Sequence, residues 1–236
     1  MSPHQSLILS GEQDRCEEAE FIYKRVINCY TSQLGPDHSS TLGALNNLAY
    51  LLEKEGKLSE AEGVAILAAE GYRRVSGDIH QNTMNAFLHV ADLLNIQKSF
   101  LRAEEQYQMA LQMCKSLLGA EHPRTLDTMN KLGNLLSARN KLNDAIKMHT
   151  SAFVGYSTLY GEFHVITAET ALLLGILYQK KRRWTRAADM FDIAFQGLEA
   201  GLGEENELTI IAKDSLYEVH KKSEELSKLA QWCIII

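Results

Sequence analysis

The stretch Leu118–Leu126 reads L-G-A-E-H-P-R-T-L. Its glycine, histidine and threonine recur at intervals of 42 residues along most of the chain. In the last copy, Asn206 stands where the histidine is expected. The recurring residues are Gly35, Gly77, Gly119, Gly161 and Gly203; His38, His80, His122 and His164; and Thr41, Thr83, Thr125, Thr167 and Thr209. A fixed period of this length predicts an array of stacked, equivalent units.

Each unit contains two runs of apolar residues with the spacing of a helix, separated by a short turn. In the first complete unit the runs comprise Leu45, Leu48, Ala49 and Leu52, followed by Ala61, Val64, Ala65, Ala68 and Tyr72. The turn between them, Gly56-Lys57-Leu58, is typical of two antiparallel helices. Small residues recur on both helices, at Ala49 and Ala61 in this unit, and allow a close approach. The sequence therefore predicts an all-α, superhelical solenoid of stacked antiparallel helix pairs.

Three parts are expected along the chain. Residues 1–16 are an N-terminal segment with a partial first repeat, 17–226 are the array, and 227–236 are an apolar tail. The array is expected to open with a lone second helix at about 17–33 and to end with a capping helix at about 207–226, whose charged side chains provide a polar outer face. Between them, four hairpins are expected at about 39–76, 81–118, 123–160 and 165–202.

Composition narrows the function classes. The chain has 24 Lys and Arg against 30 Asp and Glu, a net charge of −6, so it lacks the basic face that nucleic acid requires. No stretch approaches the roughly 20 apolar residues of a membrane-spanning helix, and residues 1–10 do not resemble a signal peptide. The four cysteines form no C-x-x-C pair and are expected to be reduced thiols. These features predict a cytoplasmic protein that binds no nucleic acid.

No residue pattern indicates an enzyme or a cofactor. The chain has no G-x-S-x-G turn, no P-loop and no H-E-x-x-H motif, and no small-molecule substrate is expected. Each of the four repeated histidines lies in a different unit, and neighbouring helix pairs are about 10 Å apart. Zinc ligands must lie about 2 Å from one ion, so these histidines are too far apart to share one. We therefore expect them to pack the loops and cap the helices and expect no metal site. His89 and His149 are interpreted as ordinary core or surface histidines.

The units resemble the tetratricopeptide pattern. They place a large residue at the seventh position, a small one at the eighth, and alanine at the twentieth and twenty-seventh, as in Leu174, Gly175, Ala187 and Ala194. The 42-residue length and the L-G-x-x-H-P-x-T-L block are similar to those of kinesin light chains and of the C-terminal arrays of fungal NACHT or NB-ARC signalling ATPases. The resemblance covers about 17–220 and implies a non-enzymatic scaffold for protein–protein interaction.

The resemblance also implies where a partner binds. In tetratricopeptide arrays the fifth and ninth positions of each first helix face a concave groove that holds a peptide or partner domain. In kinesin light chains the first Asn of an L-N-N-L block contacts the cargo backbone, and Asn46 matches it. None of the eight groove positions carries Lys or Arg, so an acidic cargo motif lacks basic partners there. An alternative for the asparagines is that they only satisfy neighbouring helix ends. The predicted groove residues are Asn46, Tyr50, Leu88, Asp92, Asn130, Asn134, Leu172 and Ile176.

Two further hypotheses come from the C-terminal half. The turn Arg182–Ala188 resembles the G-R-W-x-E-A-E turns of the fungal arrays, which implies the alternative of a regulatory or sensor array, detached or truncated, of a STAND-type signalling ATPase. The final residues, Cys233-Ile-Ile-Ile, fit the C-a-a-X form and make Cys233 a candidate for prenylation, with a lipid anchor and membrane association as the consequence. The other interpretation is an apolar tail that covers the end of the last helix.

Overall fold

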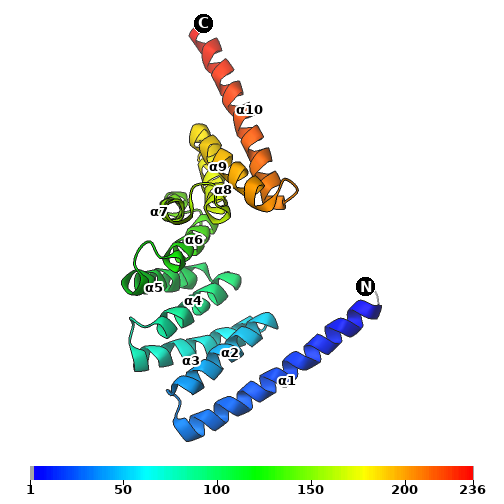
Figure 1. Ribbon diagram of the computed structural model, residues 1–236, viewed down its shortest axis with the longest axis vertical. Coiled ribbons are helices and arrows are strands. Elements are labelled where there is room, and N and C mark those ends of the chain that lie inside the picture. Colours follow the sequence, from blue (N-terminus) through cyan, green and yellow to red (C-terminus); the bar gives the residue numbers. More distant parts are fainter. Residues whose placement is uncertain (1–2, 236) are drawn as a thin grey trace. The chain divides into compact units, whose positions relative to one another are not determined.

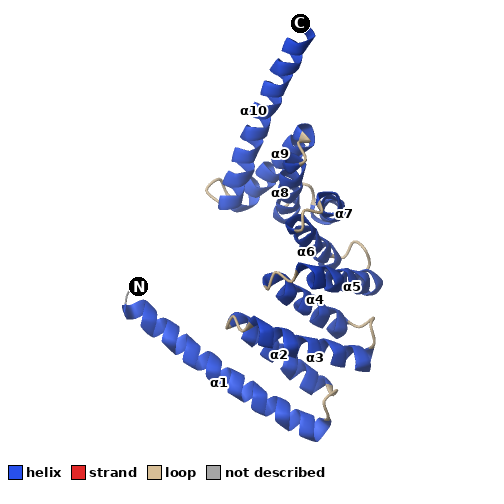
Figure 2. Ribbon diagram, turned by 180° about the vertical axis from the view of Figure 1, so that it is seen from behind, coloured by secondary structure: helices blue, strands red, loops and turns tan. Residues whose placement is uncertain are grey.

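The protein is described by a computed structural model, which gives the backbone of residues 3–235 and the side chains of residues 17–225. The described chain contains ten α-helices and no strand. The helices are joined by short loops (Figure 2). They form two compact units, Met1–Leu117 and Leu118–Ile236.

The first unit contains the lone helix α1 (Pro3–Leu34) and two hairpins (Figure 1). The hairpins are α2 (Ser39–Lys54) with α3 (Leu58–Ser76), and α4 (Gln81–Ile96) with α5 (Phe100–Leu118). Helix α1 packs against α2, α2 against α3, and α3 against α4. Each helix therefore buries its apolar stripe against its neighbours in the sequence.

The second unit repeats this arrangement. Its hairpins are α6 (Pro123–Ala138) with α7 (Leu142–Tyr160), and α8 (Val165–Lys180) with α9 (Trp184–Leu202), and they are followed by α10 (Glu207–Ile235). Helix α7 packs against both α6 and α8, and α9 packs against both α8 and α10. Stacked helix pairs confirm the predicted all-α solenoid architecture in each unit.

The turns inside the hairpins share one backbone motif. In the first of them Gly56 has φ of +74°, its N–H donates to the Glu53 carbonyl, and the Lys57 N–H donates to the Leu52 carbonyl. This pair of hydrogen bonds satisfies carbonyls that the helix end leaves open. In the other three hairpin turns this position also has a positive φ, although the residue is not glycine. These residues are Lys98, Asn140 and Arg182.

The loops between hairpins explain the recurring residues. Gly119 follows the end of α5 with φ of +91°, and the Thr125 Oγ1 donates to its carbonyl at 2.7 Å. The His122 Nδ1 accepts from the Arg124 N–H at 3.1 Å and thereby caps α6. His38, His80 and His164 cap α2, α4 and α8 in the same way. Asn206 replaces the imidazole with its Oδ1, which accepts from the Leu208 N–H at 2.9 Å. The predicted capping role of the histidines is confirmed.

The small residues mark the contact between the helices of a pair. Ala61, Ala103, Ala145 and Ala187 are fully buried. A Cβ atom on Gly133 would lie 2.6 Å from the His149 ring, which no side chain tolerates without a shift. The two backbones can therefore approach closely only because these side chains are small.

The helix bounds match the expected ones except at the two outer helices. Helix α1 begins at Pro3 rather than near 17, and α10 continues to Ile235 rather than ending near 226. Proline at the first position favours a helix start, and no glycine or proline follows Glu207 to stop α10. Both outer helices are consequently longer than those inside the array.

Candidate interaction surface of the first helices

In the first unit, Tyr50 of α2 stacks on His89 of α4. The ring centroids are 3.7 Å apart and the rings are inclined by 11°. His89 is buried, and its Nε2 lies 2.9 Å from the Glu53 Oε2 of α2. Tyr50 itself keeps 44% of its surface exposed. The stack and the contact with Glu53 thus hold an exposed aromatic ring in a defined orientation between two first helices.

Tyr50 also lines an open hollow of about 320 Å³. The hollow is bounded by Tyr23 of α1 and by Asn47, Leu51 and Lys54 of α2. Two phenol groups, an amide and an ammonium group can all donate hydrogen bonds, and the amide can also accept. This combination suits the main chain and polar side chains of a peptide.

The other predicted groove residues of the first unit differ in exposure. Asn46 is half-buried one turn before Tyr50. Leu88 is only 6% exposed and belongs to the core of the unit. Asp92 is half-buried and accepts a hydrogen bond from the Tyr107 hydroxyl of α5. Tyr50 is therefore the most exposed of the four, and Leu88 is the least.

In the second unit, Asn130 of α6 is engaged with its neighbours. Its Nδ2 donates to the Thr170 Oγ1 of α8 at 2.9 Å, and its Oδ1 accepts from the His149 Nδ1 of α7 at 2.9 Å. His149 is 1% exposed, and burial lowers its pKa to about 4. The neutral imidazole is therefore the form that donates to Asn130. One amide links three helices, and both of its ends already have protein partners.

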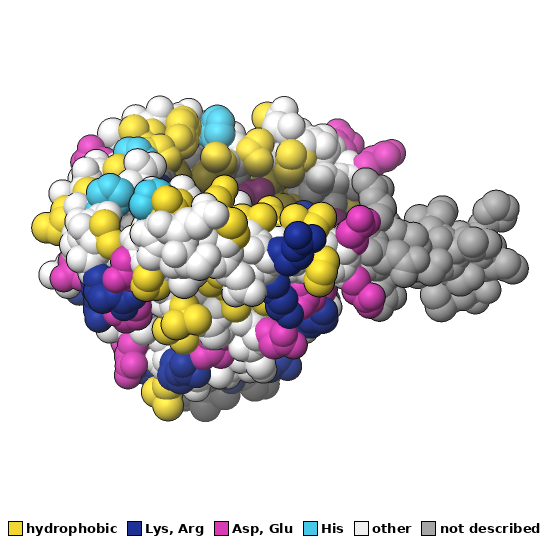
Figure 3. Space-filling model, turned by 90° about the horizontal axis from the view of Figure 1, so that it is seen from below, with side chains coloured by type: hydrophobic (Ala, Val, Ile, Leu, Met, Phe, Trp, Pro, Cys, Tyr) yellow, Lys and Arg dark blue, Asp and Glu magenta, His cyan; other side chains and the backbone are white. Residues whose placement is uncertain are grey.

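Of the remaining predicted residues in the second unit, Asn134 is exposed, Ile176 is half-buried, and Leu172 is 5% exposed. The structure thus places Asn134 and Ile176 on surfaces of α6 and α8 that a partner can reach. On the face drawn in Figure 3, basic and acidic side chains are interspersed.

Sequence reasoning missed the residues that orient Tyr50 and two that line the hollow beside it. His89, Glu53, Asn47 and Lys54 were not among the predicted groove residues. One signal was available, because His89 stands 42 residues after Asn47 and 42 residues before Lys131. A polar residue at the same position of three successive units indicates a shared environment at the surface of the first helices.

The structure also bears on metal binding and membrane insertion, within the residues that it describes. Within residues 17–225, no three His, Cys, Asp or Glu side chains are grouped as metal ligands. No helix in the described part is long and apolar enough to cross a membrane. Cys233, the candidate prenylation site, lies outside the residues whose side chains are described.

Antiparallel helix pairs of constant length, each capped by the same loop, define an α-helical repeat protein of the solenoid class. Two tetratricopeptide repeat family models match the chain, one over residues 41–82 and the other over residues 82–157. No curated protein matches the chain. Residues 41–157 of the chain are therefore tetratricopeptide repeats, a repeat family that builds scaffolds for protein–protein interaction.

Solved structures with the same fold include kinesin light chain-like proteins. BtubC (BKLC) from P. vanneervenii is 19% identical, with a TM-score of 0.71 over 93% of this chain and 88% of that one. A putative kinesin light chain from Podosopora anserina, with nearly identical TPR-like repeats, is 16% identical, with a TM-score of 0.68 over 82% of this chain and 93% of that one. A second structure of that putative light chain, which carries one substitution, is 14% identical with the same TM-score over 84% and 93%.

Proposed function

We propose that this scaffold binds a peptide or an extended segment of a partner protein on the surface of its first helices, with Tyr50 as the main anchor in the first unit. The observation that carries the proposal is the exposed Tyr50 ring held by the buried His89 beside a hollow lined with hydrogen-bond donors. A rigid, partly exposed aromatic ring contributes much binding energy at little entropic cost. Asn46 and Asn47 add amide groups that can bond an extended main chain.

The same surface in the second unit contributes differently. Asn134 and Ile176 are its accessible predicted residues. Asn130 can contribute only through its remaining N–H or by giving up its bonds to Thr170 and His149. Leu88 and Leu172 are assigned to the support of the surface, because they are buried.

The test begins with the capture of a partner by the purified chain and its identification by mass spectrometry. Affinity for that partner is then measured for Tyr50→Ala and Tyr50→Phe. We expect Tyr50→Ala to weaken binding roughly 30-fold, as loss of an aromatic anchor worth about 2 kcal/mol does. Tyr50→Phe retains the stack on His89 and should weaken binding only about three-fold to ten-fold, through the lost hydroxyl.

Tyr217→Ala is the matched control, because Tyr217 is 71% exposed on α10 and does not line the hollow. It should bind as the parent does. Unchanged helicity by circular dichroism shows that each variant is folded. If Tyr50→Ala binds as tightly as the parent, the partner docks elsewhere and the proposal is wrong.

The second candidate function, a sensor array of a STAND-type signalling ATPase, is supported by the turn Arg182–Ala188. In that case the scaffold serves to gate a nucleotide-binding module rather than to hold an independent partner. The discriminating observation is genomic: an adjoining upstream reading frame with a P-loop supports the sensor. Prenylation at Cys233 is tested separately by mass spectrometry of the protein from eukaryotic cells, and an unmodified thiol contradicts it.

A further inference from the structure

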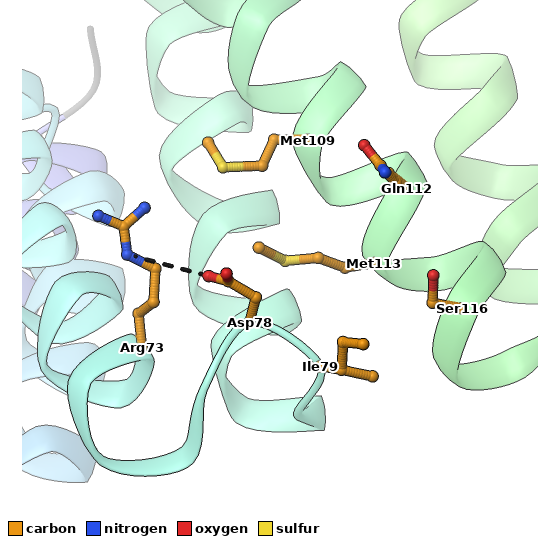
Figure 4. A pocket seen from close by; sticks show the side chains of 7 residues that line it. All are labelled: Arg73, Asp78, Ile79, Met109, Gln112, Met113 and Ser116. Carbon is orange, nitrogen blue, oxygen red and sulfur yellow. Dashed lines mark ion pairs between the residues drawn. The ribbon is translucent and has the colours of Figure 1, made fainter.

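A second hollow lies away from the first helices, between the end of α3 and the face of α5 (Figure 4). Its volume is about 310 Å³. Met109 and Met113 point into it from α5, and Ile79 closes it from the loop before α4. Ile79 is 64% exposed, so its side chain is accessible from solvent. The hollow, called here the methionine pocket, therefore has an apolar floor and an apolar wall.

The pocket occurs where one unit departs from the repeat. Met113 occupies the position that is Gly71, Gly155 and Gly197 in the other complete units. A Cβ atom on Gly71 would lie 2.2 Å from the Leu42 Cδ2, and one on Gly155 would lie 2.5 Å from the Leu126 Cδ2. A whole methionine side chain thus needs more space beside the first helix of its pair than the glycines do. Methionine is flexible and polarizable, so it can adapt its shape to an incoming apolar group.

The rim of the pocket is polar, but its charges are already compensated. The Arg73 guanidinium lies 2.8 Å from the Glu70 carboxylate and 4.0 Å from the Asp78 carboxylate. It also lies over the Phe87 ring, 5.6 Å from the centroid. A charged occupant would lose water without finding an unpaired counter-charge here, whereas an apolar one has no such hydration to lose. Charge complementarity therefore favours a neutral, apolar occupant.

Two further rim residues suit a polypeptide. Gln112 and Ser116 are exposed and lie four residues apart on α5, so they share one face of that helix. An amide and a hydroxyl group can both donate to and accept from a peptide main chain. The volume is at the lower end of ligand pockets, which range from about 300 to 1,000 Å³, and fits one large side chain.

We propose that the methionine pocket binds one uncharged apolar side chain of an extended partner segment, whose main chain bonds to Gln112 and Ser116. This site is formed by α3, α5 and the loop between α3 and α4, so it is separate from the surface around Tyr50. A protein partner can consequently occupy either surface or both. The proposal does not depend on the function proposed for the first helices.

The test uses methyl NMR of the full chain labelled with ¹³C at the methionine methyl groups. The probe is N-acetyl-phenylalaninamide, a single apolar residue with its main-chain amides, and the charged comparison is N-acetyl-lysinamide. We expect the Met109 and Met113 signals to shift saturably with the phenylalanine probe at millimolar concentration, the range for so small a ligand. The lysine probe should leave them in place.

Ile79→Ala should weaken the phenylalanine probe roughly five-fold, because it removes the apolar wall. Leu67→Ala is the matched control: Leu67 is 61% exposed on α3 and does not line the pocket, so this variant should bind as the parent does. Tyr50→Ala should also leave the probe affinity unchanged, which separates this test from that of the first helices. Equal shifts with both probes, no saturable shift, or an unchanged affinity in Ile79→Ala would each overturn the proposal.

Discussion

At the scale of single residues, the absence of a side chain is as informative as its presence. Gly133 and Gly175 occupy equivalent places on α6 and α8. A Cβ atom on either would lie 2.6 Å from a ring on the paired helix, that of His149 or Phe191. In these two units the first helix therefore keeps a glycine opposite a large ring, and packing at this contact leaves no room for another methyl group.

Gly133→Leu is expected to unfold the helix pair in which it lies. The added side chain must displace the buried His149, and such overpacking costs roughly 1 to 3 kcal/mol or more. The measurement is the free energy of unfolding by urea. Gly63→Ala is the control: it lies in α3 with nothing within 4 Å of its Cβ position, so it should stabilise the chain by roughly 0.5 to 1 kcal/mol. An unchanged free energy of unfolding for Gly133→Leu would show that this helix contact is wrongly placed.

At the scale of the helices, the same contact between the two helices of a pair is polar in one unit and apolar in the next. Leu172 and Phe191 form an apolar pair between α8 and α9, whereas the equivalent positions on α6 and α7 carry Asn130 and His149. The polar pair extends to Thr170, so it ties α6, α7 and α8 together. A buried polar network stabilises only when every member has a partner.

A double-mutant cycle tests this network. His149→Phe alone leaves the Asn130 Oδ1 without its donor and should cost roughly 1 to 3 kcal/mol in the free energy of unfolding. Adding Asn130→Leu converts the pair to the combination found in the next unit and should recover most of that loss. If the two substitutions are additive instead, the Asn130–His149 hydrogen bond contributes nothing to stability.

The same network makes the stability depend on pH. Burial lowers the His149 pKa from 6.5 to about 4, so the unfolded chain takes up a proton at a pH where the folded chain does not. The contribution of the neutral, buried His149 to the free energy of unfolding is complete above about pH 6.5. It decreases as the pH falls, and roughly 2 kcal/mol of it is lost at about pH 5. Urea unfolding at about pH 7 and pH 5 measures it, and the double variant should lack this component.

At the scale of the whole molecule, the recurring histidines act locally rather than together. Each of the four accepts a hydrogen bond on Nδ1 from the helix that it caps. None of them belongs to either of the two proposed interaction surfaces, the one around Tyr50 and the methionine pocket. The repeated residues thus build the scaffold, and residues that differ between units are the ones proposed to bind a partner.

Equilibrium dialysis of the full chain against zinc is expected to detect no stoichiometric ion. A metal ligand must offer a nitrogen lone pair. The capping Nδ1 atoms already use theirs for a backbone N–H, and a neutral ring that accepts on Nδ1 carries its proton on Nε2. A chain with one tightly bound zinc per molecule would contradict the capping role. Calcium-loaded buffer, which suits oxygen ligands, serves as the comparison.

The sequence by itself determined the 42-residue period, the all-α fold class and the bounds of the helices inside the array, because these depend on local chemistry. Gly119 past a helix end, His122 at a helix start and the spacing of leucines act over a few residues and repeat in each unit. Even so, the turn position of Gly56 is filled by Arg182 in a later unit at φ of +56°, so the loop geometry outweighs the preference of the residue.

Only the tertiary structure decided which polar side chains are available to a partner. Asn46 and Asn130 occupy equivalent positions in the sequence, yet Asn130 is bonded to His149 and Thr170, which come from two other helices. Tyr50 is oriented by His89, and the methionine pocket is lined by Ile79 and by Met113, which stands where other units have glycine. These properties depend on contacts between residues about 20 to 40 positions apart, where one altered neighbour changes burial and hydrogen bonding without changing the repeat.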